Sequence, residues 1–185
     1  ALREVFNDAT LRAQAISRLA PKRLRVADVG TGTGILACEL ARLGLHVIGI
    51  DQSARMLEAA RSKIESETFP LGGRIELRRG EAENIPLADG EVDAALAHMV
   101  LHYVTSPDRV IREMARVLRP GGTLVAVDFV SHDLKWMEQE LGVVWNGFPG
   151  ETVRDWFSSA GLIDIAVEES ESLAKDRDLP ATLIA

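Results

Sequence analysis

Short apolar runs alternate with segments of helical periodicity along most of this chain. Residues 25–29 form a largely apolar run of strand length, and a glycine-rich turn follows at 30–34. From Ile35 to Leu43 the apolar residues then recur at the spacing of one helix face. A strand, a tight turn and a helix in this order are typical of the βαβ unit, in which helices connect parallel strands. The pattern therefore predicts an α/β domain.

The same alternation continues to the end of the chain and predicts seven strands with helices on both faces of one sheet. The predicted strands are 25–29, 45–50, 74–79, 92–97, 123–130, 163–167 and 181–185. The predicted helices are 35–43, a helix capped by Ser53 that continues through Ile64, 107–118, and 151–160, which Gly161 closes. Pro120-Gly121-Gly122 is expected to stop the third helix, and the last two strands are expected to pair. The predicted sheet is mostly parallel.

The chain is expected to hold a single domain at residues 25–185, preceded by a helical N-terminal segment at 1–24. It begins with Ala rather than Met and shows no signal-peptide pattern, so we expect it to be processed, excised or part of something longer. The irregular part of the pattern is 131–150, which holds Trp136 and Trp145. These tryptophans either cover the edge of the sheet or form a wall for a substrate, and the pattern favours neither interpretation.

Composition and charge narrow the class of protein. The 185 residues are 46% hydrophobic and 26% charged, which is ordinary for a globular domain. Against 28 Asp plus Glu stand 21 Lys plus Arg, and the formal net charge of -7 disfavours a nucleic-acid partner. No apolar run approaches the roughly 18 residues of a membrane-spanning helix, and a single cysteine, Cys38, excludes an internal disulfide. We therefore expect a cytoplasmic protein without a membrane partner, and we predict no particular oligomeric state.

A glycine loop and two carboxylates carry the candidate chemistry. Gly30, Gly32 and Gly34 let the backbone turn tightly after the first strand and approach a ligand with no side chain between. The loop suits a close strand-to-helix connection or a G-x-G-x-x-G dinucleotide fingerprint, although its third glycine comes one residue early. Asp51 ends the second strand, about 20 residues on, where a carboxylate can accept from ribose hydroxyls. Asp28 suits a cationic amine better than a pyrophosphate. A nucleoside that carries an amino acid satisfies both carboxylates.

Four motifs in order resemble those of class I S-adenosylmethionine-dependent methyltransferases. They are Asp28-Val-Gly-Thr-Gly-Thr-Gly34, Ile50-Asp51-Gln-Ser53, Gly80-Glu-Ala-Glu-Asn-Ile-Pro86 and Leu118-Arg-Pro-Gly-Gly122, and they cover residues 25–130. Beyond them, His132-Asp133 and Gly142-Val-Val-Trp-Asn-Gly-Phe148 resemble the tail of methyltransferase domains that follow an ArsR-type winged-helix repressor domain. Residues 1–24 are too short to form a winged helix. The resemblance implies S-adenosylmethionine as the cofactor.

The same resemblance implies a cofactor site, residue by residue. Its members would be Asp28, Gly30, Thr31, Gly32, Gly34, Asp51, Gln52, Met56, Glu81, Ala82 and His98. Asp28 and the glycines would hold the methionine end, and Asp51 the ribose. Glu81, which stands where Asp is more usual, would accept from the adenine amino group, and the backbone of Ala82 would meet a ring nitrogen. His98 would touch the cofactor mainly through its backbone.

Two of these assignments have structural alternatives. Met56 shares one helical face with Leu57 and Ala60, so packing in the core explains it at least as well as contact with the cofactor. Glu81 and its neighbour Glu83 are alternatively the exposed carboxylates of a solvated loop.

His102 and Tyr103 are the candidate catalytic residues. They follow the fourth strand, and ligands of open α/β sheets lie outside the carboxyl ends of the strands. A histidine with a pKa near ~6.5 would deprotonate a hydroxyl or amine acceptor at neutral pH. Methyl transfer from a positively charged sulfur depends mainly on alignment and desolvation, so His102 is alternatively a packed residue with no role as a base. The 4 histidines complete no H-E-x-x-H pattern, and we predict no metal.

These features together predict a Rossmann-like domain that transfers the methyl group of S-adenosylmethionine to a small-molecule acceptor. The alternative is a domain that senses S-adenosylmethionine or S-adenosylhomocysteine for a transcriptional regulator, because the tail resembles ArsR-linked domains. Both functions need the same cofactor pocket, so neither the glycine loop nor Asp51 separates them. A third interpretation, an NAD-dependent oxidoreductase, is weakened by the early third glycine and by Asp28.

Overall fold

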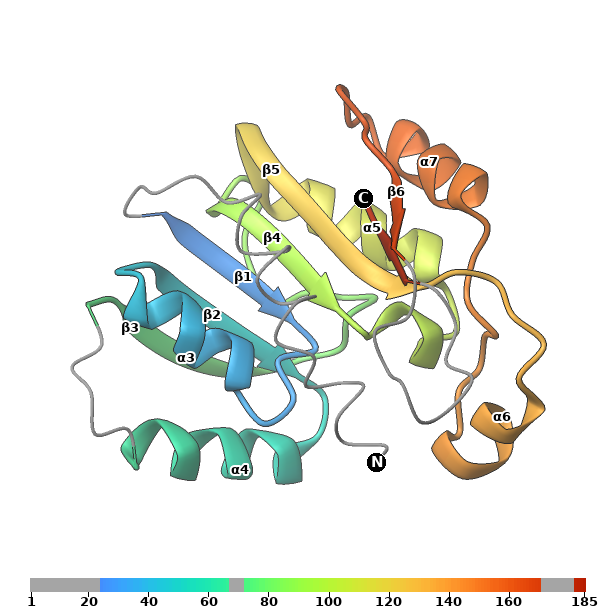
Figure 1. The fold of residues 1–185 in the computed structure, drawn as a ribbon. Coiled ribbons are helices and arrows are strands. Elements are labelled where there is room, and N and C mark those ends of the chain that lie inside the picture. Colours follow the sequence, from blue (N-terminus) through green and yellow to red (C-terminus); the bar gives the residue numbers. More distant parts are fainter. Residues whose placement is uncertain (1–23, 67–71, 171–181) are drawn as a thin grey trace.

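Seven strands form one sheet in the computed structural model, which describes residues 24–66, 72–170 and 182–185 (Figure 1). The strands are β1 (Arg25–Val29), β2 (His46–Asp51), β3 (Arg74–Arg79), β4 (Val92–His98), β5 (Leu118–Phe129), β6 (Glu168–Ser170) and β7 (Thr182–Ile184). The helices are α3 (Ile35–Arg42), α4 (Ala54–Glu65), the 3-10 helix η1 (Leu101–Tyr103), α5 (Pro107–Val117), α6 (Lys135–Leu141) and α7 (Gly150–Ser159).

The strands lie in the order β3-β2-β1-β4-β5-β7-β6. The first five strands in this order are parallel to one another, whereas β7 is antiparallel to both β5 and β6. The predicted α/β fold with a mostly parallel seven-stranded sheet is therefore confirmed. The order also reverses direction between β1 and β4, because the chain builds outward from β1 on one side and from β4 on the other.

Consecutive apolar residues give the central strands two buried faces. Val26 of β1 belongs to the core under α3, together with Leu40 of that helix. Its neighbours Ala27 and Val29 belong to the opposite core, which α5 covers through Ile111. Successive strand residues point to opposite faces, so a strand that is apolar at every position is buried on both sides. Figure 1 shows α3 on one face of the sheet and α5 on the other, as expected from the sequence.

Local signals at the start of α3 and α4, the first two helices of the described residues, agree with the structure. Gly34 precedes α3 with a φ of 74°, a left-handed conformation that glycine adopts without strain. Ser53 caps α4 as predicted, since its side chain accepts a hydrogen bond from the Met56 backbone nitrogen at 3.3 Å. Both helices therefore begin where the sequence places them, immediately after the strands that carry the glycine loop and Asp51.

The prediction that Pro120-Gly121-Gly122 stops the third helix is wrong. Helix α5 ends at Val117, and Leu118 already belongs to β5. The Pro-Gly-Gly motif lies inside β5, where the register with β4 shifts. A side chain at Gly122 would come within 2.8 Å of the Asp93 carbonyl oxygen, so glycine here allows the two strands to approach each other.

The predicted strand at 163–167 is also wrong, although the expected pairing of the last two strands is correct. The strand that pairs with β7 is β6, which begins at Glu168. Ile163 is exposed, and the Ile165 carbonyl accepts a hydrogen bond from Arg154 of α7. The alternating segment therefore lies along α7 instead of in the sheet, because the same apolar alternation suits either surface.

The region 131–150 is not wholly irregular, because α6 lies within it. The predicted N-terminal helical segment at 1–24 falls outside the described residues except for Leu24, and so does the first residue of the predicted strand at 181–185. No helix in the described part of the chain has both the length and the apolar character to cross a membrane.

Candidate functional site

A cavity of about 860 Å³ opens where the strand order reverses, at the carboxyl ends of β1, β2 and β4. Its lining combines the glycine loop after β1, the residues that follow β2 and β3, and the segment after β4. Loops that leave neighbouring parallel strands in opposite directions separate at this point and leave a crevice between them. The topology therefore creates the cavity, and the residues at the strand ends determine what it can bind.

The glycine loop forms one wall. The backbone nitrogens of Gly30 and Thr31 both donate to the Ile50 carbonyl oxygen, at 2.8 and 2.9 Å, which holds the loop against β2. A side chain on Gly30 would come within 2.3 Å of Val100, so the loop packs tightly on the segment after β4. A side chain on Gly32 would approach only the Gly30 carbonyl oxygen, at 3.9 Å, because this glycine faces the cavity. The two glycines thus serve packing and ligand access, respectively.

Asp51 ties the glycine loop to the start of α4. One carboxylate oxygen accepts from the Gly32 backbone nitrogen at 2.9 Å, and the other accepts from the Ser53 backbone nitrogen at 2.8 Å. Each carboxylate oxygen has two lone pairs, so both can still accept from a ligand hydroxyl. Asp51 lines the cavity at the end of β2, as the sequence predicts for a group that binds ribose.

Asp28 is the buried charge of the site. Its carboxylate lies beneath the loop and accepts a hydrogen bond from the Thr31 hydroxyl at 2.6 Å. Burial raises the pKa of Asp28 to about 6; the Thr31 hydroxyl opposes this shift, and the nearby negative charge of Asp51 adds to it. A cationic group bound in the cavity would favour the ionised form. An amine ligand would therefore bind more tightly through its attraction to the ionised Asp28 carboxylate.

Helix α4 and the turn after β3 supply the rest of this half of the cavity. Met56, Gln52 and Ala82 line it, and the Met56 side chain is partly exposed rather than packed in the core with Leu57. Glu83 also lines it, and its carboxylate accepts from the backbone nitrogen and the hydroxyl of Thr105, both at 3.2 Å. The core-packing alternative for Met56 therefore does not describe the structure.

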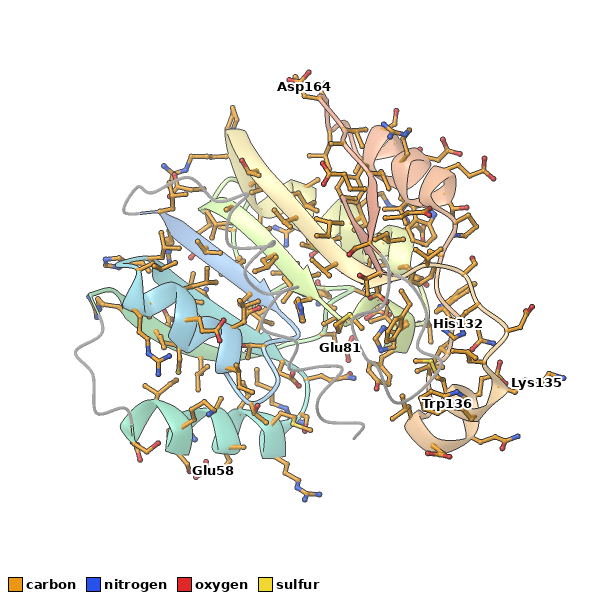
Figure 2. The ribbon with its side chains drawn as sticks, in the orientation of Figure 1. Glu58, Glu81, His132, Lys135, Trp136 and Asp164 are labelled. Atoms are coloured by element: carbon orange, nitrogen blue, oxygen red, sulfur yellow. The ribbon has the colours of Figure 1, made fainter. Side chains whose placement is uncertain are left out.

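Two residues assigned to the cofactor site lie outside the cavity lining. A side chain on Gly34 would meet Ala60 of α4 at 3.0 Å, so this glycine allows two helices to approach each other. Glu81 is exposed in the turn that follows β3, where it forms an isolated bridge with Asn84 (Figure 2). The remaining predicted cofactor residues are brought together around one cavity.

The segment after β4 forms the opposite wall. His98 lines the cavity at the end of the strand, and Met99 then takes a φ of 57°, which is unusual for a residue other than glycine. Its backbone nitrogen donates to the Val127 carbonyl oxygen at 2.8 Å, which holds this turn in place. The turn directs Val100 and Tyr103 into the lining. Strain of this kind is retained where neighbouring contacts over-determine the backbone, as at binding sites.

The two candidate catalytic residues occupy different surroundings. Tyr103 lines the cavity and is half-exposed, and burial, with a smaller contribution from Asp128, raises its pKa. His102 is fully buried and does not line the cavity. Its ring packs between those of Tyr103 and Phe129, with centroids 4.2 and 4.9 Å away.

Asp128 is the buried carboxylate behind this wall that sequence reasoning missed. This carboxylate is fully buried near the end of β5 and accepts from His102 Nδ1 at 2.7 Å and from the Leu101 and Phe129 backbone nitrogens at 2.8 Å each. It therefore fixes η1 on the sheet. The signal was visible as the only charged residue in the apolar run at 123–130, since buried carboxylates are rare unless they are paired.

The tryptophans of the predicted irregular region divide between the two interpretations. Trp136, a residue of α6, is partly buried and packs against one of the two cores (Figure 2). Trp145 keeps an exposed ring, and its indole nitrogen donates to the Val104 carbonyl oxygen at 2.9 Å. Trp136 therefore helps to cover the sheet, whereas Trp145 lies outside the cavity lining and a role for it as a wall for a substrate stays a prediction.

His132 lies between β5 and α6. Its Nδ1 accepts from the Leu134 backbone nitrogen at 3.2 Å, and burial, together with the nearby His102, lowers its pKa. It does not belong to the cavity lining. In the described part of the chain, no group of three or more His, Cys, Asp or Glu side chains is placed to hold a metal ion.

The fold and the site together define a Rossmann-like domain with a ligand cavity at the strand-order reversal. A family model described as a methyltransferase domain matches residues 27–126, more than half of the chain. The chain belongs to this methyltransferase domain family. The matched residues run from β1 into β5 and include both walls of the cavity.

Individual relatives agree with this assignment. A protein of Mycobacterium tuberculosis (strain ATCC 25618 / H37Rv) named as an uncharacterized methyltransferase is 40% identical over 144 residues, or 77% of this chain and 55% of that protein. The demethylmenaquinone methyltransferase of Clavibacter sepedonicus is 33% identical over 129 residues, or 69% of this chain and 51% of that protein. This chain therefore spans about half the length of the curated relatives that it matches.

Among solved structures, a SAM-dependent methyltransferase of Thermotoga maritima superimposes with a TM-score of 0.72 and 26% identity. The match covers 97% of this chain and 89% of that chain. The similarity therefore extends beyond the residues of the family model to nearly the whole chain.

Proposed function

We propose that this chain binds S-adenosylmethionine and transfers its methyl group to a small-molecule acceptor. One observation carries the proposal: a single cavity brings together the glycine loop, the buried Asp28 and the Asp51 carboxylate. Membership in the methyltransferase domain family supports it. The net charge of -7 favours a small molecule over a nucleic acid as acceptor.

The residues present suit this cofactor. Gly32 offers a backbone with open space above it, and the buried Asp28 suits the cationic amine of a methionine group. Asp51 retains lone pairs for ribose hydroxyls, and Met56 and Ala82 offer surface for an adenine ring. Within this proposal Gly34 acts by letting α3 approach α4, and the exposed Glu81 is kept as the group that accepts from the adenine amine.

The cofactor supplies a methyl carbon on a positively charged sulfur, and a lone pair of the acceptor displaces that sulfur. The protein then has to align the acceptor and exclude water. We propose that Tyr103, which lines the cavity, contacts the acceptor. His102 is fully buried beside Asp128, so we propose that it contributes by holding the wall that Tyr103 and Val104 form.

The relatives favour transfer over the sensing alternative. Both curated relatives described above carry the name of a methyltransferase, and one is named for demethylmenaquinone, a small molecule. The proposal keeps the finer resemblance of residues 132–133 and 142–148 to the tail of ArsR-linked methyltransferase domains. The full-length gene product tests that resemblance, because a winged helix upstream of this domain would support it.

The proposed function is tested by calorimetry with S-adenosylhomocysteine, followed by a methyl-transfer screen with radiolabelled S-adenosylmethionine. We expect saturable binding at one site per chain and transfer of label to at least one uncharged small molecule. Absence of binding by the folded protein would contradict the proposed cofactor. Tight binding with no transfer to any acceptor class would favour the sensing domain.

A further inference from the structure

We infer that Tyr103, Val144 and Trp145 form an apolar shelf that binds the uncharged, apolar body of the methyl acceptor. This acceptor shelf rests on the proposed function, which it extends by naming the class of acceptor. The three side chains come from two segments that lie about 40 residues apart in sequence and that hydrogen bonds join at the rim of the cavity.

The shelf is a concentration of exposed apolar surface. Among the described residues, the large apolar side chains exposed to solvent are Leu43, Met56, Tyr103, Val144, Trp145 and Ile163. Tyr103, Val144 and Trp145 have exposed fractions of 41%, 54% and 40%. Single exposed apolar residues are ordinary, but a group of them beside a cavity, on segments that hydrogen bonds join, marks a surface that binds another molecule.

Hydrogen bonds hold the two segments of the shelf together. The backbone nitrogens of Val144 and Trp145 both donate to the His102 carbonyl oxygen, at 2.8 and 3.1 Å. The Trp145 indole nitrogen donates to the Val104 carbonyl oxygen at 2.9 Å. Because its one donor is already engaged, the exposed part of the Trp145 side chain offers a ligand only apolar ring surface.

The cavity wall beside the shelf continues the same chemistry. Met99, Val100 and Val104 line the cavity next to Tyr103, so apolar surface runs from the interior to the rim. The raised pKa of Tyr103 keeps its phenol neutral at physiological pH. Val144 and Trp145 carry no charge. An apolar molecule that enters along this wall would lose contact with water at every step.

A charged acceptor fits this surface less well. An anion would require Lys or Arg, and neither is among the three residues of the shelf or the apolar wall beside it. A cationic amine would gain from a carboxylate, and neither the three residues of the shelf nor the apolar wall beside it supplies one. We therefore assign the shelf to an uncharged acceptor with a flat apolar part, such as an aromatic ring.

The test measures the binding of 2-naphthol, an uncharged flat probe, to the protein saturated with S-adenosylhomocysteine, with choline as the cationic comparison. Val144→Asp places a charge on the shelf, and Ile163→Asp places the same charge on an apolar residue that is 84% exposed elsewhere. Trp145→Ala removes the largest ring of the shelf. We expect Val144→Asp and Trp145→Ala to weaken 2-naphthol binding at least tenfold, and Ile163→Asp to leave it unchanged.

Cofactor binding separates failure of the shelf from failure of the proposed function. We expect all three variants to bind S-adenosylhomocysteine within threefold of the wild type, which also shows that they fold. Wild-type protein that does not bind S-adenosylhomocysteine would overturn the proposed function itself. If S-adenosylhomocysteine binds normally, three results with 2-naphthol would overturn the shelf alone. These are no binding to the wild type, normal binding to the Val144→Asp variant, or weaker binding than choline.

Discussion

The two walls of the cavity are built in different ways. The wall proposed for the cofactor, residues 28–34 and 51–56 and called the cofactor wall below, consists of short motifs whose backbone groups bond to each other or to Asp51. The wall proposed for the acceptor, residues 99–104 and called the acceptor wall below, is held by contacts with distant segments, among them residues 144–145 and the buried Asp128. A short sequence motif therefore predicts a site that backbone conformation forms, whereas a site formed by the burial of distant residues leaves no such motif.

The two walls also differ in the chemistry that they offer. The lining of the cofactor side includes the carboxylates of Asp28 and Asp51 and the ammonium group of Lys63 as well as apolar residues, whereas the segment after β4 contributes mainly valine, methionine and aromatic side chains. Polar groups recognise one particular ligand through directed hydrogen bonds, and an apolar surface accepts several ligands of similar shape. The cofactor is therefore the better specified of the two ligands.

The largest effect should follow from removing the centre of the acceptor wall. Asp128→Ala leaves His102 and the Leu101 backbone nitrogen without their buried acceptor, so we expect the free energy of unfolding in urea to fall by about 3 kcal/mol. Affinity for S-adenosylhomocysteine should stay within threefold, because the cofactor wall does not contain Asp128. Asp89→Ala removes a carboxylate whose side chain is 82% exposed, and should change stability little. If Asp128→Ala weakened S-adenosylhomocysteine binding by as much free energy as it costs in stability, the two walls would not be independent.

The next effect concerns the open face of the glycine loop. Gly32→Ala adds a side chain that faces the cavity, and we expect S-adenosylhomocysteine affinity to fall about a hundredfold, or about 2.7 kcal/mol. Gly161→Ala is the matched control, since Gly161 also has a positive φ and open space around it but closes α7. Both variants should lose similar stability, about 1 kcal/mol. Normal calorimetric binding by Gly32→Ala would place the ligand elsewhere.

A smaller effect is expected at the ribose position. Asp51→Asn removes the charge but keeps the shape, and we expect a tenfold loss of S-adenosylhomocysteine affinity by calorimetry, about 1.4 kcal/mol. The variant also weakens the bonds from the Gly32 and Ser53 backbone nitrogens, and with them the start of α4. Ser53→Ala serves as the control, because it keeps the bond to Asp51 and removes only the side-chain cap of α4. Loss of that cap should cost about 1 kcal/mol of stability and leave affinity unchanged. Equal losses of affinity in both variants would mean that Asp51 acts only by holding α4.

The smallest effect is a dependence on pH that only the cofactor wall should show. The pKa of Asp28 is raised to about 6, so the proton must leave before the carboxylate can attract the amine of S-adenosylhomocysteine. Binding should therefore strengthen as pH rises through 6, by about fourfold between pH 5.5 and 7.5 if the complex holds Asp28 ionised. Asp28→Asn should bind more weakly at pH 7.5 and lose this slope. A slope that persists in the variant would have to come from another group.

The local structure of the cofactor wall was largely predictable. The bounds of β1 and β3 and the Ser53 cap match the sequence, because apolar runs and capping residues act over a few neighbours. The errors came where one pattern suits two environments. The alternating residues 163–167 lie along α7, and Pro120-Gly121-Gly122 lies within β5, since pairing with a distant strand determined both outcomes.

By itself, the sequence determined the α/β class, the glycine loop and the position of Asp51, because these depend on strand and helix periodicity and on backbone freedom at glycine. The burial of His102 beside Asp128, 26 residues away, and the bond of Trp145 to Val104 follow from the folded arrangement, as does the packing of Trp136 against the core. Burial and long-range hydrogen bonds depend on which segments the folded sheet brings together. Local periodicity does not depend on which distant segments meet, so the acceptor wall could be described only from the folded structure.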